Sequence, residues 1–228
     1  MIKDNLQQVL QQIESAAVGC GRDPDSVRLV AVSKTVPAES VRAAIEAGVT
    51  TLGENYVQEA RDKIEALADC EVSWHFIGHL QSNKAKYAVK LFDLIHSVDS
   101  VKLAEEIDKR AAGIGKKQAV LVQVNIAEEE SKSGVSAEES IALVREISAL
   151  EHLEVRGLMT MPPFFNQPER VRPYFKALRQ LRDRIREMDI AGAALEELSM
   201  GMTGDFKVAI EEGATLVRIG TAIFGERA

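Results

Sequence analysis

Cysteine, an excess of basic residues and long apolar runs are the features that this sequence lacks most clearly. Only two cysteines occur among the 228 residues, and their positions match neither a metal-binding spacing nor a disulfide framework. We therefore expect Cys20 and Cys70 to be reduced thiols in a cytoplasmic protein. No two histidines have ligand spacing with a third ligand nearby, so we also expect no metal site.

The charge balance and the hydropathy pattern exclude two further classes. The chain carries 35 acidic and 28 basic residues, a formal net charge of −7, whereas a nucleic-acid-binding domain needs a basic face. A small basic pocket for an anionic ligand remains compatible with this balance. No apolar run is long enough to span a bilayer, and the start, Met1–Asn5, lacks the apolar core of a signal peptide. We therefore expect neither a nucleic-acid partner nor a membrane.

What the sequence does contain is a regular alternation of strand and helix signals. Apolar residues at helical spacing predict a leading helix over 2–17. We then expect eight strands, at 28–33, 50–53, 73–77, 93–98, 118–126, 153–160, 195–199 and 215–219. Helical stretches between them are expected near 38–47, 55–67, 83–90, 100–112, 136–150, 169–188 and 204–212.

This alternation favours a single-domain (β/α)8 TIM barrel over residues 1–228, with an extra N-terminal helix. The chain ends soon after the eighth strand, so the leading helix could fill the place of an eighth helix. An open, doubly wound sheet is the alternative, because alternation alone does not show closure. No proline-, glycine- or serine-rich linker divides the chain.

A lysine stands at the carboxyl end of the first predicted strand, which runs Leu29-Val30-Ala31-Val32-Ser33-Lys34. A lysine there points its amine into the mouth of a sheet or barrel. Burial disfavours the charged form, and the neutral amine can attack an aldehyde to form a Schiff base. A solvated lysine at a strand end is the alternative interpretation.

The last two predicted strands end in segments suited to an anion. Ser199–Asp205 contains two glycines, and Thr203 or Asp205 could cap the following helix, whose exposed amides favour an anion. The eighth strand ends with Gly220 and Thr221, which offer amides and a hydroxyl. Ordinary turn chemistry is the alternative. Placement of both segments at the usual phosphate site of a barrel favours the phosphate.

Arg218 adds a third chemical group to this set. It lies amid apolar residues of the eighth strand, so a guanidinium that faces the barrel needs a partner. A phosphate site, a Schiff-base lysine and a buried arginine together suggest pyridoxal 5′-phosphate (PLP). The phosphate, aldehyde and pyridine nitrogen of this cofactor need such partners.

A series of motifs runs along nearly the whole chain: Ala31–Thr35, Gly53–Glu59, Trp74–Lys84, Asn125, Ser131–Gly134, Arg156–Met159, Leu198–Thr203 and Val217–Gly225. In these motifs and their order the sequence resembles the pyridoxal phosphate homeostasis protein family, also known as proline-synthetase co-transcribed homologues. Thr203 stands where many relatives have serine, and it keeps the hydroxyl. His79 stands where some relatives have proline.

The resemblance implies a barrel like the amino-terminal domain of bacterial alanine racemase, with an internal aldimine at Lys34. It places the cofactor's phosphate near Ser199, Thr203, Gly220 and Thr221. It also places Arg218 at the pyridine nitrogen and Asn55 near the ring. Members of the family are regarded as PLP carriers or regulators of intracellular vitamin B6, without an established catalytic activity. We therefore expect a monomer that binds PLP and has PLP-requiring apoenzymes as partners.

Two enzymatic alternatives remain open. A PLP-dependent amino-acid racemase would need acid/base groups on both faces of the bound substrate. Lys34 could serve one face, but the second β domain that supplies a tyrosine in alanine racemase is absent from this sequence. A Schiff-base aldolase would use Lys34 without a cofactor. Two loops, Glu128–Gly134 and Pro162–Asn166, are candidate lids, whereas His75 and His96 are expected to be core histidines.

Overall fold

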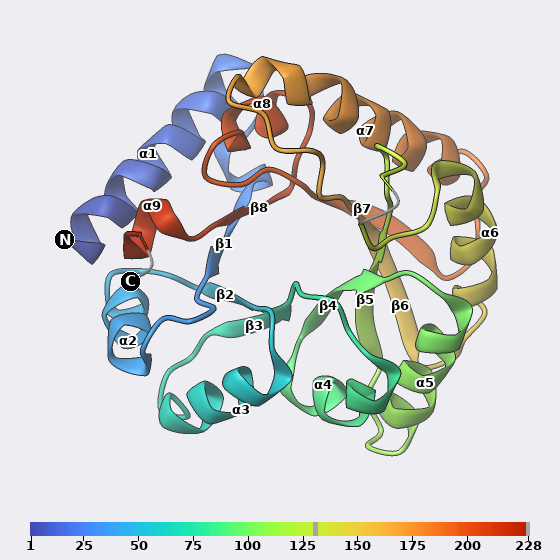
Figure 1. Cartoon of the computed structure of the whole chain (residues 1–228). Coiled ribbons are helices and arrows are strands. Elements are labelled where there is room, and N and C mark those ends of the chain that lie inside the picture. Colours follow the sequence, from blue (N-terminus) through green and yellow to red (C-terminus); the bar gives the residue numbers. More distant parts are fainter. Residues whose placement is uncertain (130–131, 227–228) are drawn as a thin grey trace.

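The computed structural model describes residues 1–129 and 132–226, and eight parallel strands in this part of the chain close into a barrel (Figure 1). The strands are β1 (Arg28–Val32), β2 (Thr51–Glu54), β3 (Ser73–Phe76), β4 (Leu94–Val98), β5 (Gln118–Gln123), β6 (Leu153–Met159), β7 (Ala193–Ser199) and β8 (Leu216–Ile219). The barrel closes because β1 pairs with β8, in a register that sets Val30 opposite Arg218. The predicted barrel is confirmed, and the open-sheet alternative is wrong.

The helices surround this barrel on its outer side (Figure 1). They are α1 (Ile2–Gly19), α2 (Ala38–Glu46), α3 (Val57–Ala66), α4 (Ala85–Leu91), α5 (Val101–Ala112), α6 (Ala137–Ile147), α7 (Arg172–Arg186), α8 (Phe206–Glu211) and α9 (Thr221–Phe224). Short 3-10 helices are η1 (Pro24–Ser26), η2 (Ser82–Lys84) and η3 (Pro168–Val171). No helix in the described residues combines the length and apolarity that crossing a membrane requires.

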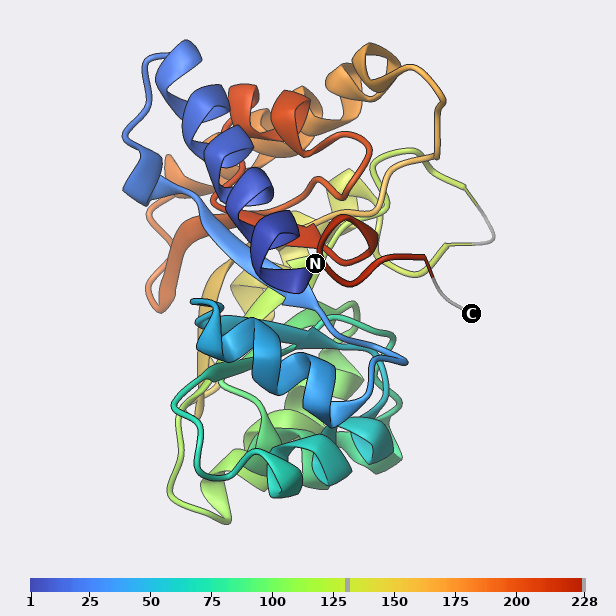
Figure 2. The same cartoon turned by 90° about the vertical axis from the view of Figure 1, so that its left-hand side faces the viewer.

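The end of the chain is where the sequence prediction was incomplete. A one-turn helix, α9, follows β8, and α1 packs beside it and α8 (Figure 2). The Asn5 side-chain amide donates a hydrogen bond to the Ile223 carbonyl at 3.1 Å. The leading helix therefore covers this part of the barrel together with α9. Four residues are too few to show helical periodicity, so the sequence pattern missed α9.

Two apolar layers hold the fold. The outer layer lies between strands and helices, and α7 shows how it forms: Phe175, Leu178 and Ile185 recur at helical spacing and are fully buried. A second cluster joins side chains from five strands inside the barrel: Val30, Leu94, Leu121, Met159 and Leu216. The barrel interior is therefore packed, and the open space lies at its mouth.

Candidate functional site

Lys34 lies in the turn that directly follows β1 and lines a cavity of about 300 Å³. The same cavity is lined by residues from the ends of β2, β6, β7 and β8: Asn55, Met161, Phe164, Phe165, Met202, Thr203, Gly204, Asp205, Arg218, Gly220 and Thr221. Val32 and Ile77 complete the lining. The predicted strand-end position of Lys34 is confirmed, at the end of the barrel where active sites of this fold lie.

The backbone next to Lys34 is held in an unusual conformation. Thr35 has a φ of +62°, a left-handed value that a β-branched residue rarely adopts. Its amide donates a hydrogen bond of 2.5 Å to the Glu59 carboxylate on α3. Strain of this kind persists only where the surroundings fix it. Here the contact with Glu59 fixes the direction in which the chain leaves Lys34.

A buried ion-pair cluster lies under the same turn. The Ser33 hydroxyl donates to Glu54 at 2.7 Å, and the Lys63 ammonium donates to Glu54 at 2.7 Å and to Glu59 at 2.6 Å. Lys63 also donates to the Ser33 carbonyl. Glu54 is fully buried, and its second carboxylate oxygen has no partner among the described residues. The cluster thus ties both residues that flank Lys34 to β2 and α3.

Burial sets the proton affinity of Glu54. Loss of hydration raises the pKa of its carboxyl above the ordinary 4.5, while the hydrogen bonds from Lys63 and Ser33 oppose the rise. Sequence reasoning missed this cluster. The available signal was an acidic residue, Glu54, at the carboxyl end of the second strand, where a buried carboxylate requires a buried cation nearby.

Arg218 is the buried cation at the floor of the cavity. The residue is 4% exposed, and its guanidinium donates to the Ser199 hydroxyl at 2.6 Å and to the Thr160 carbonyl at 2.9 Å. These contacts confirm the expectation that a barrel-facing guanidinium needs partners. Burial lowers the pKa of Arg218 to about 10, so the side chain remains charged at neutral pH.

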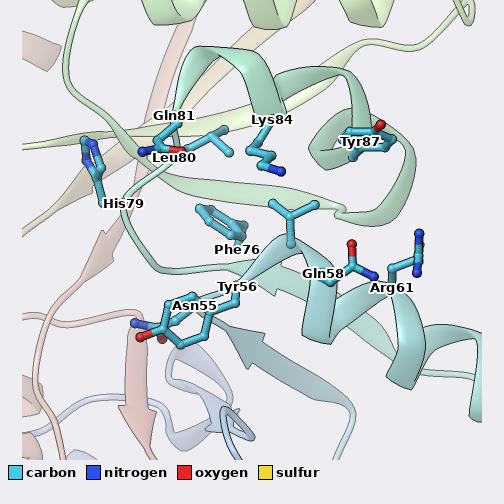
Figure 3. A pocket seen from close by; sticks show the side chains of 11 residues that line it. Asn55, Tyr56, Gln58, Arg61, Phe76, His79, Leu80, Gln81, Lys84 and Tyr87 are labelled. Atoms are coloured by element: carbon cyan, nitrogen blue, oxygen red, sulfur yellow. The ribbon is translucent and has the colours of Figure 1, made fainter.

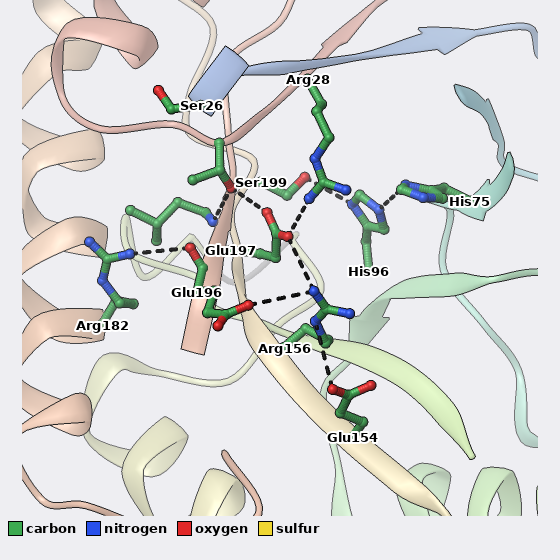
Figure 4. A network of polar contacts seen from close by, with 12 residues as sticks. Ser26, Arg28, His75, His96, Glu154, Arg156, Arg182, Glu196, Glu197 and Ser199 are labelled. Atoms are coloured by element: carbon green, nitrogen blue, oxygen red, sulfur yellow. Dashed lines mark hydrogen bonds and ion pairs between the residues drawn. The ribbon is translucent and has the colours of Figure 1, made fainter. Parts of the chain in front are cut away.

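A column of neutral side chains, Ser199, His96 and His75, continues into the barrel from the Ser199 hydroxyl that Arg218 contacts (Figure 4). The Ser199 oxygen lies 2.9 Å from His96 Nδ1, and His96 Nε2 lies 3.0 Å from His75 Nδ1. Burial lowers the pKa of His75 to about 4 and that of His96 well below its ordinary value. Because Ser199 accepts from Arg218, its O–H can donate to a neutral His96. Both histidines are buried, as predicted.

Ser199 therefore lies under the cavity and is absent from its described lining. Its hydroxyl contacts the guanidinium that the cavity presents. Whether Ser199 also contacts a bound phosphate stays a prediction. Its observed contacts suit a residue that fixes the position of Arg218.

The ends of β7 and β8 bring hydroxyls and glycines together as the sequence predicted. The Thr221 hydroxyl donates to the Thr203 hydroxyl at 3.2 Å, and both residues line the cavity. A Cβ on Gly220 would lie 3.1 Å from the Val32 carbonyl oxygen, so no larger residue fits there without a shift. The α9 helix begins at Thr221, and its first N–H groups have no partner within the helix.

Asp205 differs in detail from its expected capping role. It is the residue before α8, but its carboxylate accepts a hydrogen bond from the Met202 amide at 2.6 Å and makes no bond to the helix. Burial raises the pKa of this carboxyl. The hydrogen bond between the Met202 amide and the Asp205 carboxylate closes the Met202–Asp205 turn and so positions Thr203.

The segment after β6 supplies the apolar wall that the sequence analysis identified only as a candidate lid. Phe164 is 82% exposed and Phe165 is half-buried, and both line the cavity. The Phe165 ring stacks on Tyr174, and the Arg170 guanidinium lies 4.6 Å from its centre. Phe165 is thus anchored to η3 through Arg170 and to α7 through Tyr174. The other predicted lid, Glu128–Gly134, includes Glu130 and Ser131, which lie outside the described residues.

The chemistry of the cavity fits PLP. A lysine amine, a charged guanidinium, paired hydroxyls and a helix start meet in one space with apolar walls. Of the predicted site residues, Lys34, Asn55, Thr203, Arg218, Gly220 and Thr221 line the same cavity. Among the described residues, no group of three histidine, cysteine or acidic side chains could hold a metal ion.

The closed barrel with a lysine after β1 defines a protein of the class formed by the N-terminal domain of alanine racemase. The family model described as "Alanine racemase, N-terminal domain" matches residues 3–228. An alanine racemase from Clostridium difficile 630 has a similar fold, with a TM-score of 0.73 and 19% identity over 98% of this chain and 57% of that one. This likeness concerns the fold alone.

Within that class, the chain belongs to the pyridoxal phosphate homeostasis protein family. It is 49% identical over 225 residues to the "Pyridoxal phosphate homeostasis protein" of Aquifex aeolicus, covering 98% of this chain and 97% of the relative. It is also similar to the structure of PipY from Synechococcus elongatus with PLP bound, at 36% identity and a TM-score of 0.85. That likeness covers 99% of this chain and 100% of PipY.

Proposed function

We propose that this protein binds PLP as a Schiff base on Lys34 and acts in intracellular PLP homeostasis as a carrier or regulator. The observation that carries the proposal is the cavity itself, where Lys34, Arg218 and the paired hydroxyls of Thr203 and Thr221 meet. The full-length likeness to PLP homeostasis proteins and to PLP-bound PipY supports the same assignment.

Each part of the cofactor has a partner in this proposal. The Lys34 amine condenses with the aldehyde, so that a C=N bond forms and the aldehyde oxygen leaves as one molecule of water. The phosphate binds between the loops after β7 and β8, at Thr203, Gly220 and Thr221. Arg218 donates a hydrogen bond to the pyridine nitrogen, and Asn55 lies near the ring.

Ser33 and Thr35, the two neighbours of Lys34, determine the direction in which the Lys34 side chain enters the cavity. The cluster of Glu54, Lys63 and Glu59 holds both neighbours of Lys34, so the amine enters the cavity from a fixed backbone. A carrier must also release its cargo, and Lys34 at the open mouth of the barrel suits both steps. PLP-requiring apoenzymes are the proposed recipients.

We further propose that the whole chain works as one domain, as a monomer in the cytoplasm. Among the described residues, four of the exposed large apolar side chains line the Lys34 cavity or the cavity that adjoins it: Tyr56, Tyr87, Met161 and Phe164. The others are Met1 before α1, Leu10 and Val18 on α1, Ile114 after α5 and Met188 after α7. Single exposed apolar residues of this kind are normal on a monomer's surface. Cys20 and Cys70 are free thiols, which suits a reducing compartment.

A titration of the purified protein with PLP, followed by visible absorption, tests this function. An aldimine absorbs visible light, whereas an aldolase lysine without cofactor does not. We expect the wild-type protein to develop the aldimine band and to reactivate a PLP-requiring apoenzyme when the loaded protein is added. Absence of a band at saturating PLP would refute the proposal.

A further inference from the structure

A second cavity adjoins the one at Lys34, and it is the larger of the two. Its volume is about 610 Å³, and Asn55 lines both cavities. It lies between α3 on one side and η2 with α4 on the other (Figure 3). We refer to it as the α3–α4 cavity. Its volume lies within the range of small-molecule sites.

The lining of the α3–α4 cavity combines an apolar floor with a polar rim. Phe76 and Leu80 are buried at the floor, and Val57 is half-buried beside them. The polar groups around them belong to Asn55, Tyr56, Gln58, Arg61, His79, Gln81, Lys84 and Tyr87. Sites of this composition hold the apolar body of a ligand and orient it through a few polar contacts.

The rim carries positive charge. Lys84 is exposed, and the ion pairs among the described residues do not include it. Arg61 stands on the facing helix, with its guanidinium 2.9 Å from the carboxylate of its neighbour Asp62 (Figure 3). Because Asp62 offsets Arg61, Lys84 is the principal cation of the cavity.

The surrounding chain strengthens this local field. Residues 73–92 contain three lysines and no aspartate or glutamate, in a sequence whose net charge is −7. The pKa of the Tyr87 hydroxyl is lowered, first by its hydrogen bond with Lys86 and further by the charges of Lys84 and Arg61. An anion would therefore be attracted to this rim more strongly than to the rest of the surface of this acidic protein.

We propose that the α3–α4 cavity binds a small organic anion with an apolar body. The carboxylate or phosphate of this ligand contacts Lys84 of η2 on the side that faces Arg61 of α3. The apolar body of the ligand covers Phe76 and Leu80. This proposal does not rest on PLP binding, because Lys84 and Arg61 are absent from the described lining of the Lys34 cavity.

Calorimetric titration with three probes of similar size tests the charge requirement. The probes are phenylacetate, phenyl phosphate and the neutral benzyl alcohol, added to PLP-loaded protein so that the phosphate site at Lys34 is filled. We expect at least one of the two anions to bind, and benzyl alcohol to bind about tenfold more weakly, since only an anion can form a charge-assisted hydrogen bond with the Lys84 ammonium. Failure of both anions to bind at about 10 mM would overturn the proposal.

Variants then locate the site. Lys84→Gln should weaken anion binding about tenfold, whereas Lys84→Arg should retain it. Lys117→Gln, an equal charge change at an exposed position outside the cavity, should leave it unchanged. Anion binding to Lys84→Gln at wild-type strength would overturn the proposal. PLP binding by Lys84→Gln should match that of the wild-type protein. Loss of PLP binding would therefore count against the Lys34 site, whereas unchanged anion binding in Lys84→Gln would count against the α3–α4 cavity.

Discussion

Thr203 and Gly220 contribute to the proposed phosphate site in different ways, and their substitution separates the two effects. Thr203→Val removes a hydroxyl with little change of shape, so we expect PLP affinity to fall about tenfold. Gly220→Glu should cost more, because even a Cβ meets the Val32 carbonyl at 3.1 Å and a carboxylate would repel the phosphate. Spectroscopic titration measures both affinities.

The control for this pair is Thr50→Val, which removes an exposed hydroxyl at the amino end of β2. We expect it to bind PLP as wild type does. Unchanged affinity in both Thr203→Val and Gly220→Glu would show that the phosphate lies elsewhere.

The buried pair Glu54–Lys63 makes a prediction about stability and pH. In Lys63→Met, Glu54 loses its charged partner while remaining buried, which costs about 3–5 kcal/mol of unfolding free energy near neutral pH. Burial already raises the pKa of Glu54 above 4.5, so between pH 4.5 and the folded pKa the native state binds more protons than the unfolded state. Stability therefore falls as pH rises through this interval, and Lys63→Met should widen it.

Urea denaturation near pH 4.5 and near pH 7 measures this effect. We expect Lys63→Met to lose much more stability at the higher pH, and the double variant Glu54→Gln/Lys63→Met to recover part of the loss. An equal loss at the two pH values, or no recovery in the double variant, would contradict the assignment of a buried charge pair. Lys117→Met serves as the surface control.

At the scale of elements, the strands and long helices were predictable because each carries its own pattern. The apolar spacing of Phe175, Leu178 and Ile185 determines the buried face of α7, and apolar runs mark the strands. Sequence order also placed Lys34 and Thr203 after strand ends and Arg218 within the last strand. That six predicted site residues share one cavity follows from barrel closure, which no local pattern shows.

Other parts of the site depend on contacts that are distant in sequence. Lys63 lies on a helix face where a surface position would be expected, and only the path of α3 over β2 brings it to Glu54. The direction of the Asp205 carboxylate depends on the turn at Met202. The α3–α4 cavity likewise arises from the separation of two helices, which the sequence pattern does not specify.

The contact between β6 and β7 makes an element-scale prediction at Gly157. Leu195 in β7 has a φ of +48°, and the pairing register shifts there. As a result, a Cβ on Gly157 would lie 1.9 Å from the Glu197 carbonyl oxygen. Gly157→Ala should therefore destabilise the fold by at least about 1–3 kcal/mol in thermal or urea unfolding. Gly19→Ala, where no atom lies within 4 Å of the added Cβ, is the control, and equal stability of the two variants would contradict the register.

At the scale of the whole molecule, the barrel mouth predicts negligible turnover of amino acids. No tyrosine or histidine among the described residues lines the Lys34 cavity, and the Asp205 carboxylate is engaged by the Met202 amide. The described lining therefore offers no tyrosine or histidine as the acid/base group of a second face, and positioning alone supplies about 7–11 kcal/mol in such reactions. Incubation of the PLP-loaded protein with L-alanine in deuterated water measures this. Enzyme-dependent Cα exchange that is lost in Lys34→Ala would favour a racemase.

The central claim is that PLP is covalently bound at Lys34, and borohydride trapping followed by peptide mapping tests it most directly. Reduction converts the Schiff base into a stable secondary amine, so the modified lysine can be identified by mass spectrometry. We predict the adduct on the peptide that contains Lys34 in the wild-type protein and in Lys84→Ala, and no adduct in Lys34→Ala. An adduct on Lys84, Lys63 or another lysine, or none in the wild-type protein, would contradict the claim.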